Sequence, residues 1–150
     1  MNFPVGGVTT KGDVPFDLVV KVQEFLDSRF NGYIILSVKG TFIEEGALFF
    51  KDGVILACVV ECLGAEAIVK GTDALPYFFN ETRGFGFFQC VSLTKSQVDL
   101  VTAFDEKLLT NKIDLKDVPR MIPSVFSPRF NRVQTQKSAL EAYGLGELKV

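Results

Sequence analysis

Three cysteines carry the most versatile side-chain chemistry in this chain. Cys58 and Cys62 lie four residues apart in an apolar run, and Cys90 follows in a second run. On one strand the first two would stand roughly 13 Å apart, which is too far for a disulfide. The sequence contains no C-x-x-C pair and no histidine to complete a zinc tetrahedron. We therefore expect buried structural thiols and no metal site.

The absence of histidine also removes the usual general base near neutral pH. A Ser or Cys nucleophile would then need a Lys, Asp or Glu to activate it. Glu44 and Glu45, with Asp52 nearby, could form paired carboxylates or a metal clamp. Acidic residues are common in turns, so we interpret these three as solvated loop charges at the ends of a hairpin strand. The sequence thus predicts a protein that is not an enzyme and has no catalytic residue.

Two glycines in Arg83–Phe87 (RGFGF) raise the question of a phosphate-binding loop. The segment does not match G-x-G-x-x-G or a P-loop, and no Gly-Lys-Ser or Gly-Lys-Thr occurs in the chain. A β-strand whose glycines allow close packing is the favoured interpretation. We expect no bound cofactor.

Hydrophobic periodicity predicts two main helices. Val14–Arg29 places apolar residues at helical spacing behind Asp13, a candidate N-cap. Thr94 and Gln97 form a capping box for a second helix that runs to about Thr110. The residues expected to form the apolar stripe of this second helix are Val98, Val101, Phe104 and Leu108.

Turn residues divide the rest of the core. Leu63–Asn80 has a helical pattern, but Gly71 and Pro76 interrupt it, which indicates two short helices. Asp52-Gly53 lies between two apolar runs and predicts a β-hairpin, because both turn residues need positive φ. The expected strands are Tyr33–Lys39, Gly46–Lys51, Val54–Glu61 and Gly84–Leu93.

These elements predict an α+β fold. We expect an antiparallel sheet of three to five strands, with the central hairpin at Asp52-Gly53, packed with amphipathic helices. A chain of 150 residues has the length of about one domain. Residues 1–111 are expected to form the core domain. Residues 112–150 are expected to form a C-terminal arm punctuated by Pro, with a short helix around Ser138–Tyr143.

Phenylalanine is unusually abundant, at 15 of 150 residues. Alternation along the strand puts Phe85 and Phe87 on one face of the sheet and Phe88 on the other. Both faces must therefore be covered, either by helices of the same chain or by a second protein. The residues expected at a protein interface are Phe85, Phe87, Phe88, Phe126 and Phe130.

The arm supports an alternative hypothesis. Between Val118 and Leu140 the local charge is +4 with no acidic residue, although the whole chain has a net charge of −2. Arginine can pair with phosphates, and phenylalanine can stack on bases of single-stranded nucleic acid. The residues expected to contact nucleic acid in this alternative are Arg120, Arg129, Arg132 and Lys137, interleaved with Phe126 and Phe130.

The sequence predicts no membrane association. Its uncharged stretches are far shorter than the ~20 apolar residues that a bilayer requires. The first residues, MNFPVGGVTTKGD, lack the basic start and apolar run of a secretory signal. We expect a cytoplasmic protein with reduced thiols.

The stretch Gly46–Cys58 (GALFFKDGVILAC) resembles the PATAN-type domain. The preceding helix, the strand GYIIL, and the later motifs GAEA and GFGF extend the resemblance over roughly Phe16–Thr110. The chain is also similar to a family of uncharacterised archaeal proteins with this layout. The resemblance implies an interaction or regulatory module, often carried beside signalling domains, and it transfers no functional residue.

Together, these observations predict a non-enzymatic protein–protein interaction or regulatory module that self-associates as a homodimer. The expected partner is another protein or a second copy of the chain. The alternative is a nucleic-acid-binding protein that uses the basic, aromatic arm. The two differ in their response to salt, because apolar association persists as salt rises and phosphate binding weakens.

Overall fold

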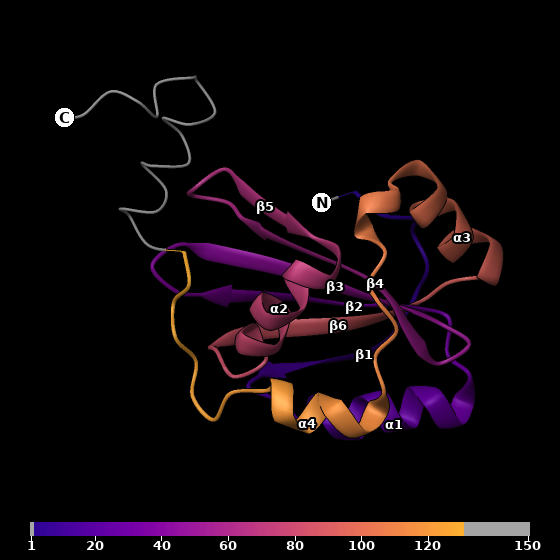
Figure 1. The fold of residues 1–150 in the computed structure, drawn as a ribbon, viewed down its shortest axis with the longest axis horizontal. Helices are drawn as coiled ribbons and strands as arrows, with labels where there is room; N and C mark the ends of the chain where they lie inside the picture. The colour runs from indigo at the N-terminus through magenta and orange to yellow at the C-terminus, as the bar shows by residue number, and fades with distance from the viewer. Residues whose placement is uncertain (1, 131–150) are drawn as a thin grey trace.

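A six-stranded antiparallel sheet with helices on both faces forms the body of the protein (Figure 1). The structure is a computed structural model that describes residues 2–130. The strands lie in the order β1-β6-β2-β3-β4-β5. Their bounds are β1 (Gly7–Val14), β2 (Gly32–Lys39), β3 (Ile43–Lys51), β4 (Val54–Cys62), β5 (Ala67–Lys70) and β6 (Gly86–Ser92). The expected antiparallel α+β sheet is confirmed, but the expected number of strands was wrong.

The two strands that the sequence did not predict are the edge strands. β1 (GVTTKGDV) has few apolar residues, and it forms because its backbone pairs with β6. β5 (AIVK) lies inside Leu63–Asn80, where helices were expected, and it pairs with the end of β4. The helices of that region are shorter and begin later, as a 3-10 turn η1 (Gly71–Ala74) followed by α2 (Leu75–Glu81). Both edge strands therefore form by backbone pairing with a neighbouring strand, and such pairing leaves little hydrophobic pattern in the sequence.

The first helix, α1 (Leu18–Ser28), begins later than expected. Asp13 and Val14 belong to β1, so the N-cap is Asp17, whose carboxylate accepts a hydrogen bond from the backbone N–H of Val20 at 3.2 Å. The side chain satisfies one of the free N–H groups of the first turn. Arg29 ends the helix in the left-handed conformation, with φ of 52°.

The hairpin between β3 and β4 is confirmed. Asp52 and Gly53 have φ of 50° and 81°, as a tight two-residue turn requires. Asn31 supports the turn, because its side-chain oxygen accepts a hydrogen bond from the backbone N–H of Asp52 at 2.9 Å.

The capping box of α3 (Lys95–Phe104) is confirmed as well. The backbone N–H of Gln97 donates to the Thr94 hydroxyl at 3.1 Å, and the backbone N–H of Thr94 donates to the Gln97 side chain at 2.9 Å. The helix ends at Phe104 rather than near Thr110. Asp105 has an extended backbone, and its carboxylate caps the 3-10 turn η2 (Glu106–Leu108).

Two hydrophobic clusters cover the two faces of the sheet. The larger one packs α1, α2 and the short helix α4 (Val118–Met121) against one face, and includes Phe50, Phe78 and Phe79. The smaller one packs α3 and η2 against the other face, around Tyr33 and Phe49. Both faces therefore receive cover from the same chain, but the second face receives less.

The described part of the arm, residues 112–130, packs on the larger cluster. It contains the 3-10 turn η3 (Leu115–Asp117) and α4, and Val118 and Phe130 are buried. The side chain of Asn80 holds the backbone of Ser127 through two reciprocal hydrogen bonds, of 2.8 and 3.0 Å. The expected helix at Ser138–Tyr143 lies outside the described residues, and the expected boundary at residue 111 stays a prediction.

No helix within residues 2–130 is long and apolar enough to cross a membrane.

We expect the Asn80 clamp to hold the segment around Ser127 in place. Asn80→Ala removes both hydrogen bonds from a buried position and should lower the free energy of unfolding by about 1–3 kcal/mol. It should also speed exchange of the Ser127 amide hydrogen. Urea denaturation and hydrogen exchange measure the two effects, and Asn111→Ala, at an exposed position, is the matched control. Unchanged exchange at Ser127 in Asn80→Ala would contradict this role.

Candidate functional site

An open apolar groove lies on the second face of the sheet, between the N-terminal segment, β4, β5 and α3. Its volume is about 510 Å³. The apolar side chains that line it come from five parts of the chain, because η2 contributes Leu108. They include Phe3, Val59, Ile68, Leu100, Phe104 and Leu108. The groove exists because α3 and the N-terminal segment cover this face without meeting over its outer strands.

Three large apolar side chains of the groove are exposed to water. Ile68 is 55% exposed, Leu100 is 51% exposed and Phe104 is 83% exposed. Single exposed apolar side chains are normal on a protein surface, whereas a group that lines one depression is a candidate interaction site. The expected stripe of α3 was therefore wrong at Phe104, because the helix ends at this residue and its ring projects outward.

The groove borders the open edge of the sheet. β5 is the last strand in the strand order, so no other described strand pairs with its outer side. An edge strand of this kind presents backbone N–H and C=O groups that a second chain can pair with. The groove and the edge together offer apolar contacts and backbone hydrogen bonds side by side.

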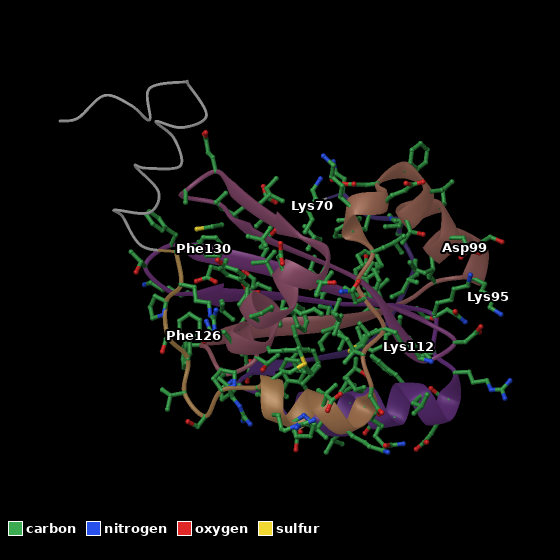
Figure 2. The ribbon with its side chains drawn as sticks, in the orientation of Figure 1. Lys70, Lys95, Asp99, Lys112, Phe126 and Phe130 are labelled. Carbon is green, nitrogen blue, oxygen red and sulfur yellow. The ribbon has the colours of Figure 1, made fainter. Side chains whose placement is uncertain are left out.

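Ion pairs fix the wall that α3 forms. Lys70 of β5 lies 2.6 Å from the carboxylate of Asp105, and the hydrogen bond from Lys70 lowers the pKa of Asp105. At the other end of the helix, Lys95 pairs with Asp52 at 2.8 Å and Asp99 pairs with Lys51 at 2.6 Å. Figure 2 shows Lys95 and Lys70 on opposite sides of α3. These contacts tie the helix to β5 and to the hairpin turn.

A second depression, of about 570 Å³, lies between α1, the hairpin turn and residues 112–118. Its lining mixes apolar residues of α1 with the charged side chains of Lys112, Asp114 and Asp117 (Lys112 is labelled in Figure 2). Leu26 and Val54, its exposed apolar residues, show only 38% and 44% of their surface. This depression offers a partner less apolar surface than the groove does.

The residues expected at an interface fall into two groups. Phe85 and Phe87 lie on the surface, 80% and 59% exposed, beside edge strand β1 at the far end of the sheet from the groove. Phe88 is buried and stacks on Phe16 with ring centroids 4.3 Å apart. The arm residues Phe126 and Phe130 also pack against the core, the latter with its ring centroid 5.0 Å from that of Tyr77.

The residues expected to contact nucleic acid are partly engaged within the protein. Arg120 pairs with Asp117 one helical turn away. The guanidinium of Arg129 lies 5.5 Å from the ring centroid of Tyr77, at cation–π distance. Arg132 and Lys137 lie outside the described residues.

Glu44 of β3 and Glu81, the last residue of α2, form a buried pair of carboxyl groups. Both side chains are fully buried, and no N–H or hydroxyl group of residues 2–130 donates a hydrogen bond to their four carboxyl oxygens. The expectation that Glu44 is a solvated loop charge was therefore wrong. Glu44 belongs to β3, where alternation turns it to the inner face with Gly46, and a Cβ at Gly46 would lie only 2.4 Å from a carboxyl oxygen of Glu81.

Both carboxyl groups have raised pKa values, a shift that favours their protonated forms. Burial raises the pKa of Glu81 well above its ordinary value, and the negative charge of Glu44 raises it further. Burial also raises the pKa of Glu44. A side-chain hydrogen bond with Glu81 and the positive charge of Arg129 lower it in part. Both residues are at 0% exposure, so the pair is part of the core.

The three cysteines are buried with free thiols, as expected. Burial raises the pKa of Cys58 well above its usual range and that of Cys90 to about 11. Thiols with a raised pKa carry little thiolate, the reactive form. Among residues 2–130, no three Cys, Asp or Glu side chains are grouped closely enough to hold a metal ion.

The family model described as "Uncharacterized protein conserved in archaea (DUF2226)" matches residues 4–105. No curated protein and no solved structure matches the chain. The matched residues include all six strands, α1, α2 and α3. They therefore include most of the groove lining and the β5 edge.

We expect Glu81→Gln to stabilise the protein at neutral pH. The folded state raises the pKa of both carboxyl groups, so it binds more protons than the unfolded chain does. Stability contributed by the pair is present below the unfolded pKa of about 4.3 and is lost as pH rises through the raised folded pKa. The amide is neutral without taking up a proton, so the variant should be about 1–3 kcal/mol more stable at pH 7 and less dependent on pH.

Urea denaturation between pH 4 and pH 8 measures this difference. Glu24→Gln is the control, because Glu24 is a solvent-exposed residue of α1. A Glu81→Gln protein that is less stable than wild type at pH 7, with the same pH profile, would show that the pair carries no shared proton.

Proposed function

The chain belongs to the family of uncharacterized proteins conserved in archaea, and within that family we propose that it is a non-enzymatic protein-interaction module that self-associates. The observation that carries the proposal is the apolar groove beside the open edge of β5. The module acts by presenting this surface to a second protein chain. Its place of action in this proposal is the cytoplasm, where the buried thiols remain reduced.

The free energy available at the groove supports this role. Ile68, Leu100 and Phe104 expose much of their surface in the free protein. Burial of apolar surface contributes about 25 cal/mol per Å², and specific interfaces bury roughly 800 Å² on each partner. In this proposal the groove forms the centre of such an interface, and three ion pairs already tie its α3 wall to the sheet before binding.

The resemblance of the hairpin Gly46–Cys58 to the PATAN-type domain is consistent with an interaction or regulatory role. The chemistry of the buried groups agrees with this, because the thiols have raised pKa values and the carboxyl pair is closed to solvent. A binding surface made of apolar side chains needs neither a reactive thiol nor an accessible carboxyl group.

We expect Phe104→Glu to weaken self-association by about ten- to hundredfold, because a charged side chain replaces one that would be buried at the interface. Sedimentation velocity of the full chain over micromolar concentrations measures the change. Phe85→Glu is the matched control, since Phe85 is equally exposed but lies at the opposite end of the sheet.

The outcomes separate the surfaces. Loss of association in Phe85→Glu alone would move the interface to Phe85 and Phe87, the surface that the sequence suggested. A strictly monomeric wild-type mass at every concentration would rule out self-association. Association that falls steeply with salt and depends on added RNA or DNA would favour the nucleic-acid alternative.

A further inference from the structure

The segment Arg83–Phe87 (RGFGF) leads into β6 with two phenylalanine rings on the surface. Phe85 is 80% exposed and Phe87 is 59% exposed. In RNA-recognition domains, the strand motif Lys/Arg-Gly-Phe/Tyr-Gly/Ala-Phe-Val-x-Phe/Tyr presents aromatic side chains that stack on bases. Arg83–Phe87 fulfils the first five positions of this motif. Phe88 stands in place of the Val, and Cys90 stands in place of the last aromatic residue.

Alternation along β6 divides the motif between the two faces of the sheet. Phe88, at the sixth position, is buried in the larger cluster. Phe87 lies on the other face, together with Val91 of the smaller cluster. Phe85 precedes β6, and its carbonyl accepts a hydrogen bond from the backbone N–H of Lys39 at 3.0 Å, which extends the pairing with β2. The two exposed rings therefore stand two residues apart on one face.

The spacing of the two rings suits unpaired bases. Residues two apart on a strand are about 6.6 Å apart. Neighbouring bases of a duplex are separated by only about 3.4 Å along the helix axis. Two successive bases can therefore stack on the two rings only when they are splayed apart, as they are in a single strand.

The ring of Phe87 borders two shallow depressions. One, of about 290 Å³, lies between β1 and β6, and the other, of about 170 Å³, lies between β6, β2 and β3. Gln89 lines both, and its amide offers donors and an acceptor to the edges of unpaired bases. The other polar side chains that line the depressions are Lys11, Asp13, Ser37 and Glu45.

The neighbours of Phe87 across the sheet are polar. They are Asp13 on β1 and Ser37 on β2. The core of a protein–protein interface is depleted in charged residues. Stacking on a base needs the flat face of a ring, and polar neighbours do not prevent it. These surroundings favour a nucleic acid over a protein as the occupant of this face.

Three exposed cations border the two rings. Arg83 comes two residues before Phe85, and Lys39 pairs with Phe85 through the backbone. Lys11 lies opposite Gln89 on β1. No ion pair within residues 2–130 engages any of the three. Their charges can therefore contact the phosphates of a strand that passes over the rings.

We propose that this face of the sheet binds single-stranded nucleic acid, with two successive bases stacked on Phe85 and Phe87 and with phosphates contacting the three cations. The site lies on β6, three strands away from β4 and its groove, and it does not depend on self-association. The acidic side chains of Asp13 and Glu45 nearby limit its affinity for a polyanion.

Fluorescence anisotropy of the full chain with labelled strands tests the site. The probes are RNA and DNA strands of randomised sequence, each of about ten nucleotides. We expect single strands to bind with a Kd on the order of 10 μM at low salt. A duplex of the same length should bind at least about fivefold more weakly, because its paired bases cannot stack on the rings. The comparison of RNA with DNA identifies which of the two the site prefers.

Substitutions at Phe87 separate stacking from simple apolar contact. Phe87→Leu keeps an apolar side chain but removes the flat ring, so it should weaken binding of the single strand at least about fivefold. Phe87→Tyr keeps an aromatic ring and should bind within about twofold of wild type. Circular dichroism confirms that each variant is folded.

The salt dependence tests the cations independently. Arg83→Gln and Lys39→Gln should each reduce the slope of log Kd against log salt by about 0.7. Lys116→Gln is the matched control, because Lys116 is an exposed lysine of η3, on the opposite side of the sheet. Its slope should equal that of wild type.

Each further result would overturn the site in a different way. Equal affinities of Phe87→Leu and Phe87→Tyr would exclude stacking. Loss of binding in Arg129→Gln, with no effect of Phe85→Leu or Phe87→Leu, would assign nucleic-acid binding to the arm. Loss of self-association instead of strand binding in Phe87→Leu would assign the rings to a protein interface. A wild-type chain that binds no strand would remove this site and leave the proposed self-association standing.

Discussion

The constraint on which this structure depends is a central sheet that is apolar on both faces. Phe49 and Phe50 are consecutive residues of β3, both fully buried on opposite sides of the sheet. Such strands need cover on both faces, and a chain of this length supplies it unequally. One face carries α1, α2 and residues 112–130, whereas the other has α3 and the N-terminal segment. The groove beside β5 is the place where that second cover ends.

The same crowding explains the buried carboxyl pair. Glu44 and Glu81 lie on separate elements, and the carboxyl group of Glu81 occupies the space left by the absent side chain of Gly46. Two buried carboxylates would repel each other strongly, so the core holds them with fewer charges than solution would give them. A carboxyl pair with fewer charges costs less free energy to bury.

Sequence rules predicted the elements that depend on neighbouring residues alone, namely the hairpin turn and the start of α3. Asp52-Gly53 fixed a turn through its φ angles, and Thr94 with Gln97 fixed a helix start through two hydrogen bonds. β1 and β5 escaped prediction because they arise from pairing with distant strands. The groove was not predicted either, because its shape depends on the residue at which α3 ends. A pattern of spacing placed Phe104 in the core, but only the finished helix shows that its last residue reaches past the sheet.

The ion pairs of α3 bear on the proposed interaction, because this helix forms one wall of the groove. Two ion pairs hold the first half of the helix to the hairpin, and Lys70–Asp105 holds the far end to β5. Each contact is weak by itself in solvent. Together they restrain both ends of the helix relative to the sheet. In the interaction proposed above, the α3 wall of the groove is already in place before contact, so we expect docking with little rearrangement of the backbone.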